Sequence, residues 1–406
     1  MCKLRYDDII FKMALGLLVS RLALFSLTGN EGERIMEAKK RLGYIDAIKG
    51  LAILVVVLHH LMPQLAASPV FEHLGGTFLL MFFCLAGYFY SPGKRTYAAN
   101  LKSKLKSLMI PFFKYSFIFW LAGTVYHMIV NKLSLLESLC CLRNFYAGSI
   151  WNRVIQDAFG WDYHHLGKLY MFLADFWFLL ALAFAYVLFL AIADWSLKSV
   201  KRSIFTMLSL IVVEAVLLRF NVTLPYNIQN TPYFAMLLLF GAFLRRTEFF
   251  SMFETRFSVT AEWVAGIILF IAGIIVSMYV EPAGNLFRGV FGQNQITAML
   301  GITAASFLLL CGLGILMRRL ELLGVRIKEL CYLGENSLYI YIFHVFFAFF
   351  ICNLTGIPLP SASSEEYPPT VKGFIVSGAL VIVCTLLSLG VAYLENRRKS
   401  RPNSAP

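Results

Sequence analysis

The chain has 406 residues, of which 59% are hydrophobic and 15% charged, and it carries a formal net charge of +13. This balance excludes an ordinary soluble globular protein, in which about 25% of the residues are charged. A nucleic-acid partner is not needed to explain the positive charge, because basic cytoplasmic loops and anionic headgroups explain it as well. Apolar stretches of about 20 residues recur, which predicts an all-α polytopic integral membrane protein.

The first 40 residues are unlike the rest of the chain. Residues 9–27 are apolar but are interrupted by Lys12 and Arg21, and no small-residue cleavage site follows, so a signal peptide is not predicted. Two interpretations stay open: an amphipathic helix at the membrane interface, or a natural start at Met36. Either way, residues 1–40 are predicted to be a dispensable cytoplasmic or interfacial segment.

Ten transmembrane helices around a central cavity are predicted for residues 41–395, followed by a basic cytoplasmic tail at residues 396–406. The expected spans lie at about 44–62, 73–90, 108–130, 171–193, 203–219, 231–245, 259–280, 296–317, 336–353 and 373–394. The connections alternate in charge, and the basic residues gather on the side of the N-terminus. By the positive-inside rule, both termini are predicted to be cytoplasmic in a plasma (inner) membrane protein.

The first span contains ionisable residues, which are costly inside a membrane and therefore indicate a functional site. Lys49 and His60 are eleven residues apart, so a helix places them about 20° apart on one face and about 16 Å apart along its axis. Asp46 lies on the same side, about 40° from His60, whereas His59 points about 80° away from Lys49. Two interpretations stay open: a stripe that faces a cavity where His60 does chemistry, or a capped helix start with a snorkelling lysine and a wet histidine pair.

Further candidates lie in the longest outer loop, residues 131–170, and in the span that follows it. The loop is rich in aromatic and amide side chains, which suit a sugar, and His164 and His165 are its candidate contacts. The alternative is an interfacial aromatic belt. In the next span, Asp175 beside Trp177 is a candidate site residue.

Other groups of residues give no sign of a metal or cofactor site. The eight cysteines show no CxxC spacing and mostly lie in or beside apolar segments, so neither a metal site nor a disulfide framework is predicted. Glu214, a second acid in an apolar segment, is interpreted as a buried structural partner, for example of Arg219. Neither a nucleotide-binding glycine loop nor a serine hydrolase elbow is found in the sequence.

Several stretches, in order, resemble one family. They are Asp46, Lys49 and His60 in the first span, then residues 81–88 (MFFCLAGY), 102–111 (KSKLKSLMIP), 175–180 (DFWFLL), 232–241 and 334–344 (GENSLYIYIFH). Together they resemble the membrane acyltransferases of family three, and most closely the polysaccharide O-acetylases that resemble fucose 4-O-acetylase. That family has an Asp, a basic residue three positions on, and an essential His eleven positions later. Ala86 stands where the family has Ser, which puts a hydroxyl role there in doubt.

The resemblance implies an O-acetyltransferase that moves an acyl group, most simply acetyl, from cytosolic acyl-CoA to a sugar hydroxyl of a cell-surface or secreted polysaccharide. It implies acetyl-CoA as a co-substrate and no permanently bound cofactor. His60 would be the general base, Lys49 would bind CoA phosphate or polarise the thioester carbonyl, and Asp46 would orient Lys49. The open alternatives are a snorkelling Lys49 and an Asp46 that caps the helix.

The same resemblance supplies candidate donor and acceptor residues. Lys102, Lys104, Lys106 and Tyr88 are the candidate donor-binding residues, although positive-inside bias explains the three lysines equally well. Asn336, Ser337 and His344 are candidate acceptor or cavity residues. The open alternatives are a helix cap for Asn336 and Ser337, and a satisfied interhelical histidine for His344.

Two other functions stay open. One is a transporter or flippase of a glycan or lipid-linked sugar, but many such proteins contain inverted repeats, and no internal repeat is found here. An acyltransferase that uses succinyl or another acyl donor is the other alternative. The acceptor sugar and the position of acylation are not predicted.

Overall fold

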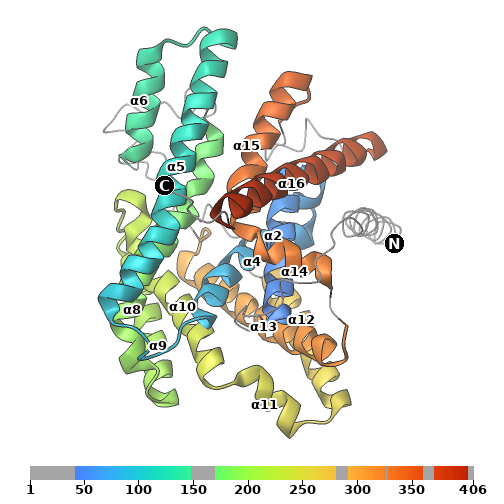
Figure 1. The fold of residues 1–406 in the computed structure, drawn as a ribbon. Coiled ribbons are helices and arrows are strands. Elements are labelled where there is room, and N and C mark those ends of the chain that lie inside the picture. Colours follow the sequence, from blue (N-terminus) through green and yellow to red (C-terminus); the bar gives the residue numbers. More distant parts are fainter. Residues whose placement is uncertain (1–41, 148–169, 280–290, 326, 360–369, 401–406) are drawn as a thin grey trace, which may run out of the picture. The chain divides into compact units, whose positions relative to one another are not determined.

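The computed structural model describes residues 42–147, 170–279, 291–325, 327–359 and 370–400. Within these ranges every regular element is a helix, and no strand occurs (Figure 1). The N-terminal segment 1–40, His164 and His165 lie outside the described residues. The predicted all-α polytopic fold is therefore confirmed.

The chain divides into two compact units: residues 1–68 together with 313–406, and residues 69–312. The first unit contains α2 (Gly43–Leu61), α3 (Pro63–Ala66), α14 (Lys328–Glu335), α15 (Ser337–Thr355) and α16 (Val371–Ser400). The second contains α4 (Pro69–Tyr88), α5 (Tyr97–Val130), α6 (Leu135–Tyr146), η4 (Met171–Phe176), α8 (Trp177–Ser196), α9 (Val200–Arg219), η5 (Pro225–Asn230), α10 (Thr231–Arg246), α11 (Phe249–Arg256) and α12 (Val259–Tyr279). The long helix α13 (Gln295–Leu322) runs across the boundary between the two units.

Helix α2 is the core of the first unit. It is apolar almost all round, as expected for a helix that other helices enclose, and it packs against α14, α15 and α16. It ends at Leu61 because Pro63 starts the short helix α3, and the residue before a proline disfavours the α conformation. His60 therefore lies in the last turn of α2, at the end opposite to Asp46.

Two glycines let α14 touch the backbone of α2. A Cβ on Gly50 would overlap the carbonyl oxygen of Leu330, and a Cβ on Gly334 would overlap the carbonyl oxygen of Asp46. Small residues at helix crossings permit such close approach, which is typical of membrane helices. The glycine that opens the 334–344 stretch thus packs on the first-span residue Asp46.

Helix α10 is the core of the second unit, packed against α4, α8 and α9. Here too glycines bring backbones together, since a Cβ on Gly87 would overlap Leu238 and one on Gly241 would overlap Cys84. The side chains beside this crossing are aromatic: the rings of Phe83 and Phe234 stack 4.4 Å apart. This unit is therefore built around a tightly packed apolar crossing.

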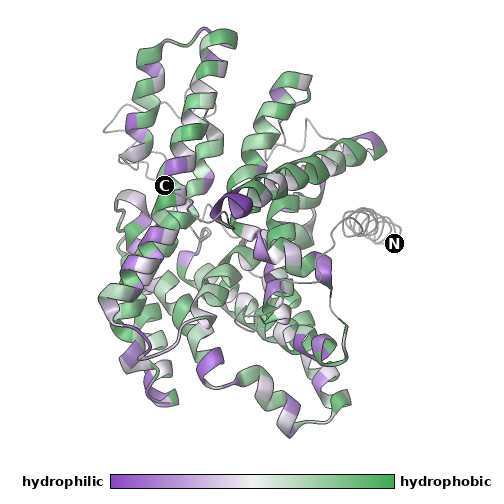
Figure 2. Ribbon diagram, viewed as in Figure 1, coloured by the Kyte–Doolittle hydropathy of each residue, from purple (hydrophilic) through white to green (hydrophobic). Residues whose placement is uncertain are grey.

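Eight of the ten expected spans correspond to helices that are long and apolar enough to cross a membrane. The other two, α9 and α10, are helices at the expected positions, but α10 has only 16 residues and α9 carries charged residues at both ends. Large apolar side chains are exposed along α12, where Ile268 is 60% exposed, as expected for a helix against lipid. Figure 2 shows α16 hydrophobic along its middle and hydrophilic at both ends.

Three boundaries differ from the sequence prediction. The expected outer loop 131–170 contains helix α6, whose start is a capping box formed by Ser134 and Glu137. The third span is the C-terminal part of a longer helix, because α5 already begins at Tyr97, after its N-cap Thr96. Helix α16 continues to Ser400, so the predicted boundary between residues 395 and 396 falls inside a helix.

Candidate active site

Asp46 and Lys49 form an ion pair near the start of α2. The Lys49 Nζ donates to Asp46 Oδ1 at 3.0 Å, and both side chains are largely buried, at 22% and 9% exposure. The helix begins at Gly43 with Leu42 at the N-cap position, so Asp46 sits one turn inside the helix and does not cap it. Of the two predicted roles for Asp46, the structure favours the partner of Lys49.

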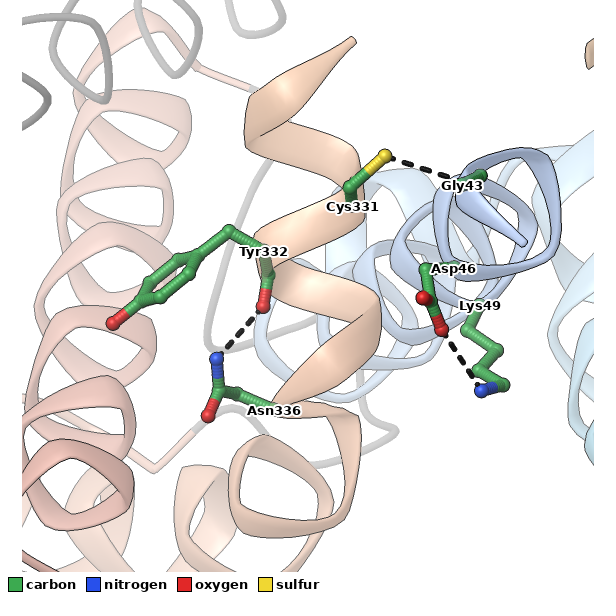
Figure 3. A network of polar contacts seen from close by, with 6 residues as sticks. All are labelled: Gly43, Asp46, Lys49, Cys331, Tyr332 and Asn336. Atoms are coloured by element: carbon green, nitrogen blue, oxygen red, sulfur yellow. Dashed lines mark hydrogen bonds and ion pairs between the residues drawn. The ribbon is translucent and has the colours of Figure 1, made fainter. Parts of the chain in front are cut away.

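Helix α14 holds this turn of α2 in place. Figure 3 shows Cys331 reaching from α14 toward Gly43, while Asp46 and Lys49 point toward each other from α2. The Cys331 thiol donates to the Gly43 carbonyl oxygen at 3.3 Å. With the backbone contact at Gly334, this bond fixes how the first turn of α2 is oriented. The pair therefore lies on a turn that is packed directly against α14.

Asn336 and Ser337 lie where α14 meets α15. Asn336 is the C-cap residue of α14 and the N-cap residue of α15, but its side chain makes no capping hydrogen bond to α15. Instead its amide nitrogen donates to the carbonyl oxygen of Tyr332 at 2.9 Å, as Figure 3 shows. Asn336 therefore occupies the N-cap position of α15, one of the interpretations that the sequence left open, but its side chain does not provide the cap. The amide bonds back to the preceding turn of α14.

His60 and His344 meet between α2 and α15, although 284 residues separate them in the chain. His60 Nδ1 lies 2.7 Å from His344 Nε2, and the rings are nearly coplanar, at 4°. His344 is 0% exposed, and its Nδ1 lies 3.0 Å from the Ile340 carbonyl oxygen and 2.9 Å from that of Tyr341. The interpretation of His344 as a satisfied interhelical histidine is supported, and its partner is the predicted catalytic residue.

His59 does not take part in this pairing in the same way. Its ring lies 5.9 Å from the ring of His60 and is tilted by 58° to it. The helical geometry that separates the two neighbours in the sequence therefore separates them in the structure. Of the two neighbours, His60 is the one that pairs with His344.

The candidate donor residues in the second unit have different surroundings. Lys102 and Lys106 are exposed on α5, whereas Lys104 is half-buried with its Nζ 4.8 Å from the centre of the Tyr186 ring. Their spacing of two residues puts Lys104 on the other face of the helix, as the sequence indicates. Tyr88 is buried, and the Arg245 guanidinium lies 5.6 Å from its ring centre.

Asp175 and Trp177 occupy the entry to α8. Asp175 lies in the 3-10 helix η4, and Trp177 begins α8 with its ring 6.2 Å from that of Phe234. Both belong to the second unit, whereas Asp46, Lys49, His60, Asn336, Ser337 and His344 belong to the first. Glu214 is fully buried and accepts from the Tyr233 backbone N–H at 3.3 Å, so it serves the start of α10.

An aromatic pocket in the second unit was missed by sequence reasoning. Its volume is about 510 Å³, and its lining residues are Phe112, Phe113, Phe117, Tyr146, Leu180, Phe184 and Tyr226. The Tyr226 hydroxyl donates to the backbone carbonyl of Tyr146. Tyr226 and Asn227 both have positive φ, at 58° and 55°. Residues other than glycine rarely adopt this conformation, so the sequence does not predict it.

These observations define a polytopic all-α membrane protein with an ion pair on α2 and a histidine pair that joins α2 to α15. A family model described as an acyltransferase domain matches residues 42–389. The chain belongs to this family, membrane acyltransferase 3, and is a membrane acyltransferase. Neither a curated protein nor a solved structure matches it significantly.

Proposed function

We propose that this membrane acyltransferase moves an acetyl group from cytosolic acetyl-CoA to a sugar hydroxyl of a cell-surface or secreted polysaccharide, with His60 as general base. The observation that carries the proposal is an imidazole in a membrane span that a second buried imidazole holds at 2.7 Å. Histidine is the side chain best suited to proton transfer near neutral pH. Intramembrane ionisable groups are costly and are kept for function.

In this reaction a single residue, His60, takes up and then returns the one proton that moves. The imidazole of His60 takes the proton of the sugar hydroxyl as that oxygen attacks the thioester carbonyl carbon. The tetrahedral adduct then loses the sulfur of CoA, so a C–O bond replaces the C–S bond. The imidazolium returns its proton to the departing thiolate. The products are an acetyl ester and free CoA, and the enzyme ends unchanged.

The depth of His60 suits a donor that enters from the cytoplasm. Fourteen residues separate Asp46 from His60, which is about 21 Å along a helix. A CoA pantetheine arm entering beside Asp46 and Lys49 would span such a distance. Lys49 supplies positive charge for phosphate or for the thioester oxygen, and Asp46 orients it at 3.0 Å. In this topology both termini face the cytoplasm of a plasma membrane protein.

The decisive experiment compares the surface glycan of wild type, a deletion strain, His60→Ala and His59→Ala by mass spectrometry. His60→Ala should abolish the acetyl mass increment while the protein stays at wild-type abundance in the membrane. His59→Ala, the matched neighbour on the same turn, should keep most of it. A fully acetylated glycan from His60→Ala would refute the proposal.

The same experiment separates the alternatives. An increment larger than acetyl that depends on His60 would show a different acyl donor. A glycan that fails to reach the surface in the deletion strain, with no ester on it in wild type, would indicate a transporter.

A further inference from the structure

We propose that His344 is a positioning residue that fixes the tautomer of His60, so that His60 carries its proton on Nδ1 and offers Nε2 as the base. The catalytic meaning of this inference rests on the proposed function. Its structural content, which nitrogen carries which hydrogen, does not. It follows from the hydrogen-bond partners of two rings.

The chain of reasoning begins at the backbone of α15. His344 Nδ1 faces two carbonyl oxygens, 3.0 Å away at Ile340 and 2.9 Å away at Tyr341. A carbonyl oxygen can only accept, so Nδ1 must carry a hydrogen, which it shares between the two. Ile340 and Tyr341 lie four and three residues earlier on the same helix. The helix itself therefore sets the tautomer of His344.

In the second step, the tautomer of His344 determines the tautomer of His60. A neutral imidazole has one N–H and one acceptor nitrogen, so the Nε2 of His344 is an acceptor. That atom lies 2.7 Å from His60 Nδ1. Two nitrogens at this distance share one hydrogen, and it must come from His60. His60 Nδ1 is then the donor, and its Nε2 keeps a lone pair.

If His344 were charged, both of its ring nitrogens would donate, and the hydrogen bond would run from His344 to His60 instead. Its side chain is 0% exposed, and placing a charge on a fully enclosed group is costly. The neutral form is therefore the one that the burial favours. The direction of donation from His60 to His344 follows from it.

The geometry also fixes the plane of the His60 ring. The two rings are nearly parallel, at 4°, while their centres are 5.0 Å apart and their nearest nitrogens 2.7 Å apart. Rings joined edge to edge in one plane give this combination, whereas rings stacked face to face do not place ring nitrogens in line for a hydrogen bond. Histidines whose second nitrogen is held in this way are fixed in both tautomer and orientation.

The first test reads the hydrogens directly. Full-length protein labelled with 15N-histidine is reconstituted in lipid, and the His60 signals are assigned by their loss in His60→Gln. We expect a protonated Nδ1 and an unprotonated Nε2 at His60, and a protonated Nδ1 at His344. A His60 that is protonated on Nε2 in the wild-type protein would overturn the proposal, whatever the enzyme acylates.

The second test uses a pair of substitutions that differ only in the acceptor. His344→Gln can place its amide oxygen near the position of Nε2, whereas His344→Leu fills the space without an acceptor. We expect His344→Leu to give His60 a mixture of tautomers and His344→Gln to keep the wild-type one. An unchanged His60 tautomer in a folded His344→Leu protein would show that His344 does not set it.

The third test asks whether the tautomer matters for the reaction. Membranes are given radiolabelled acetyl-CoA, and label in the glycan is measured against donor concentration. We expect His344→Leu to lower kcat roughly 10- to 100-fold, by analogy with the loss that follows when the outer-shell partner of a metal-bound histidine is removed, with little change in KM for acetyl-CoA. His344→Gln should recover part of that loss, and equal rates in the two variants would overturn the positioning role. If wild-type membranes acetylate no glycan, the proposed function fails, and the labelling result still decides the tautomer.

Discussion

The two units of the chain use the same packing device for different ends. In the first, Gly50 and Gly334 bring the backbones of α2 and α14 into contact; in the second, Gly87 and Gly241 do so for α4 and α10. A largely buried ion pair lies beside the first crossing, whereas stacked aromatic rings lie beside the second. Close backbone contact therefore has two uses: it fixes the rotation of a helix that carries ionisable groups, and it compacts an apolar core.

The largest expected effect comes from adding a methyl group to either crossing. In Gly334→Ala the new Cβ meets the Asp46 backbone, which cannot move like a flexible side chain, so the helices must separate. Overpacking of this kind costs about 1–3 kcal/mol, and here it also displaces the turn that carries the ion pair. We expect a lower melting temperature in detergent and a loss of acyl transfer larger than the loss of folded protein.

Two control variants test whether the glycine at the first crossing matters for activity as well as for stability. Gly241→Ala should lose comparable stability and less activity for each folded molecule. Gly378→Ala on α16, where a Cβ would meet nothing within 4 Å, should be neutral, or stabilising by up to about 1 kcal/mol from helix propensity. A Gly334→Ala protein with wild-type melting would contradict the packing described here.

A narrower effect is expected from the ion pair itself, because the substitution leaves the helix crossing intact. Asp46→Asn keeps the size of the side chain but removes the charge that holds Lys49 Nζ at 3.0 Å. A hydrogen bond to a charged group contributes about 1.5–3 kcal/mol, so we expect acyl transfer to fall by roughly tenfold or more. Labelled donor titrated against membranes gives the measurement.

Lys49→Arg is the control for the ion pair, since it keeps the charge but changes the geometry, and it should retain more activity than Lys49→Met. Wild-type activity in both variants would mean that the cation has no role in the reaction. Loss of activity in both, with normal abundance, would mean that the compact ammonium group itself is needed.

A still smaller effect, limited to stability, is expected in the second unit. Ser134 caps α6 by accepting from the Glu137 backbone N–H, and Glu137 bonds back to Ser134. Ser134→Ala should lower stability by about 1 kcal/mol, read as a shift of the melting temperature, and leave acyl transfer per folded molecule at the wild-type rate. A loss of transfer out of proportion to stability would assign α6 a part in the reaction.

The sequence could predict the features that depend on residues close together in the chain. The Asp46–Lys49 pair spans three residues, so helical periodicity alone places both on one side. The capping box at Ser134 and Glu137 is equally local, and it marks the start of a helix in a segment that was expected to be a loop. The apolar spans could be placed for the same reason, because twenty consecutive residues decide each of them.

Contacts between distant segments had no such signal. Nothing within a single span tells that His60 and His344 share a hydrogen, because 284 residues lie between them. In the sequence, Gly50 and Gly334 are small residues in apolar stretches, and nothing there predicts that their two helices cross. The shortness of α10 depends on η5 before it, where two non-glycine residues take positive φ.

The smallest expected effect concerns pH and a contact between α8 and Tyr90, two residues beyond the end of α4. The Tyr90 hydroxyl donates to Asp194 at 2.7 Å, and burial, with the neighbouring Asp194, raises the pKa of Tyr90 above its usual value of about 10. The folded chain thus favours the protonated phenol, so this contribution is fully present below about pH 10 and is lost as the pH rises through the folded pKa. Because the bond is exposed, Tyr90→Phe should cost less than about 1 kcal/mol near neutral pH. Above pH 10 the stability of Tyr90→Phe should fall less steeply than that of wild type, and Tyr97→Phe serves as the neighbouring control. Melting temperatures from pH 7 to about 11 that fall in parallel for Tyr90→Phe and wild type would show that this bond does not help to hold the residues after α4 against α8.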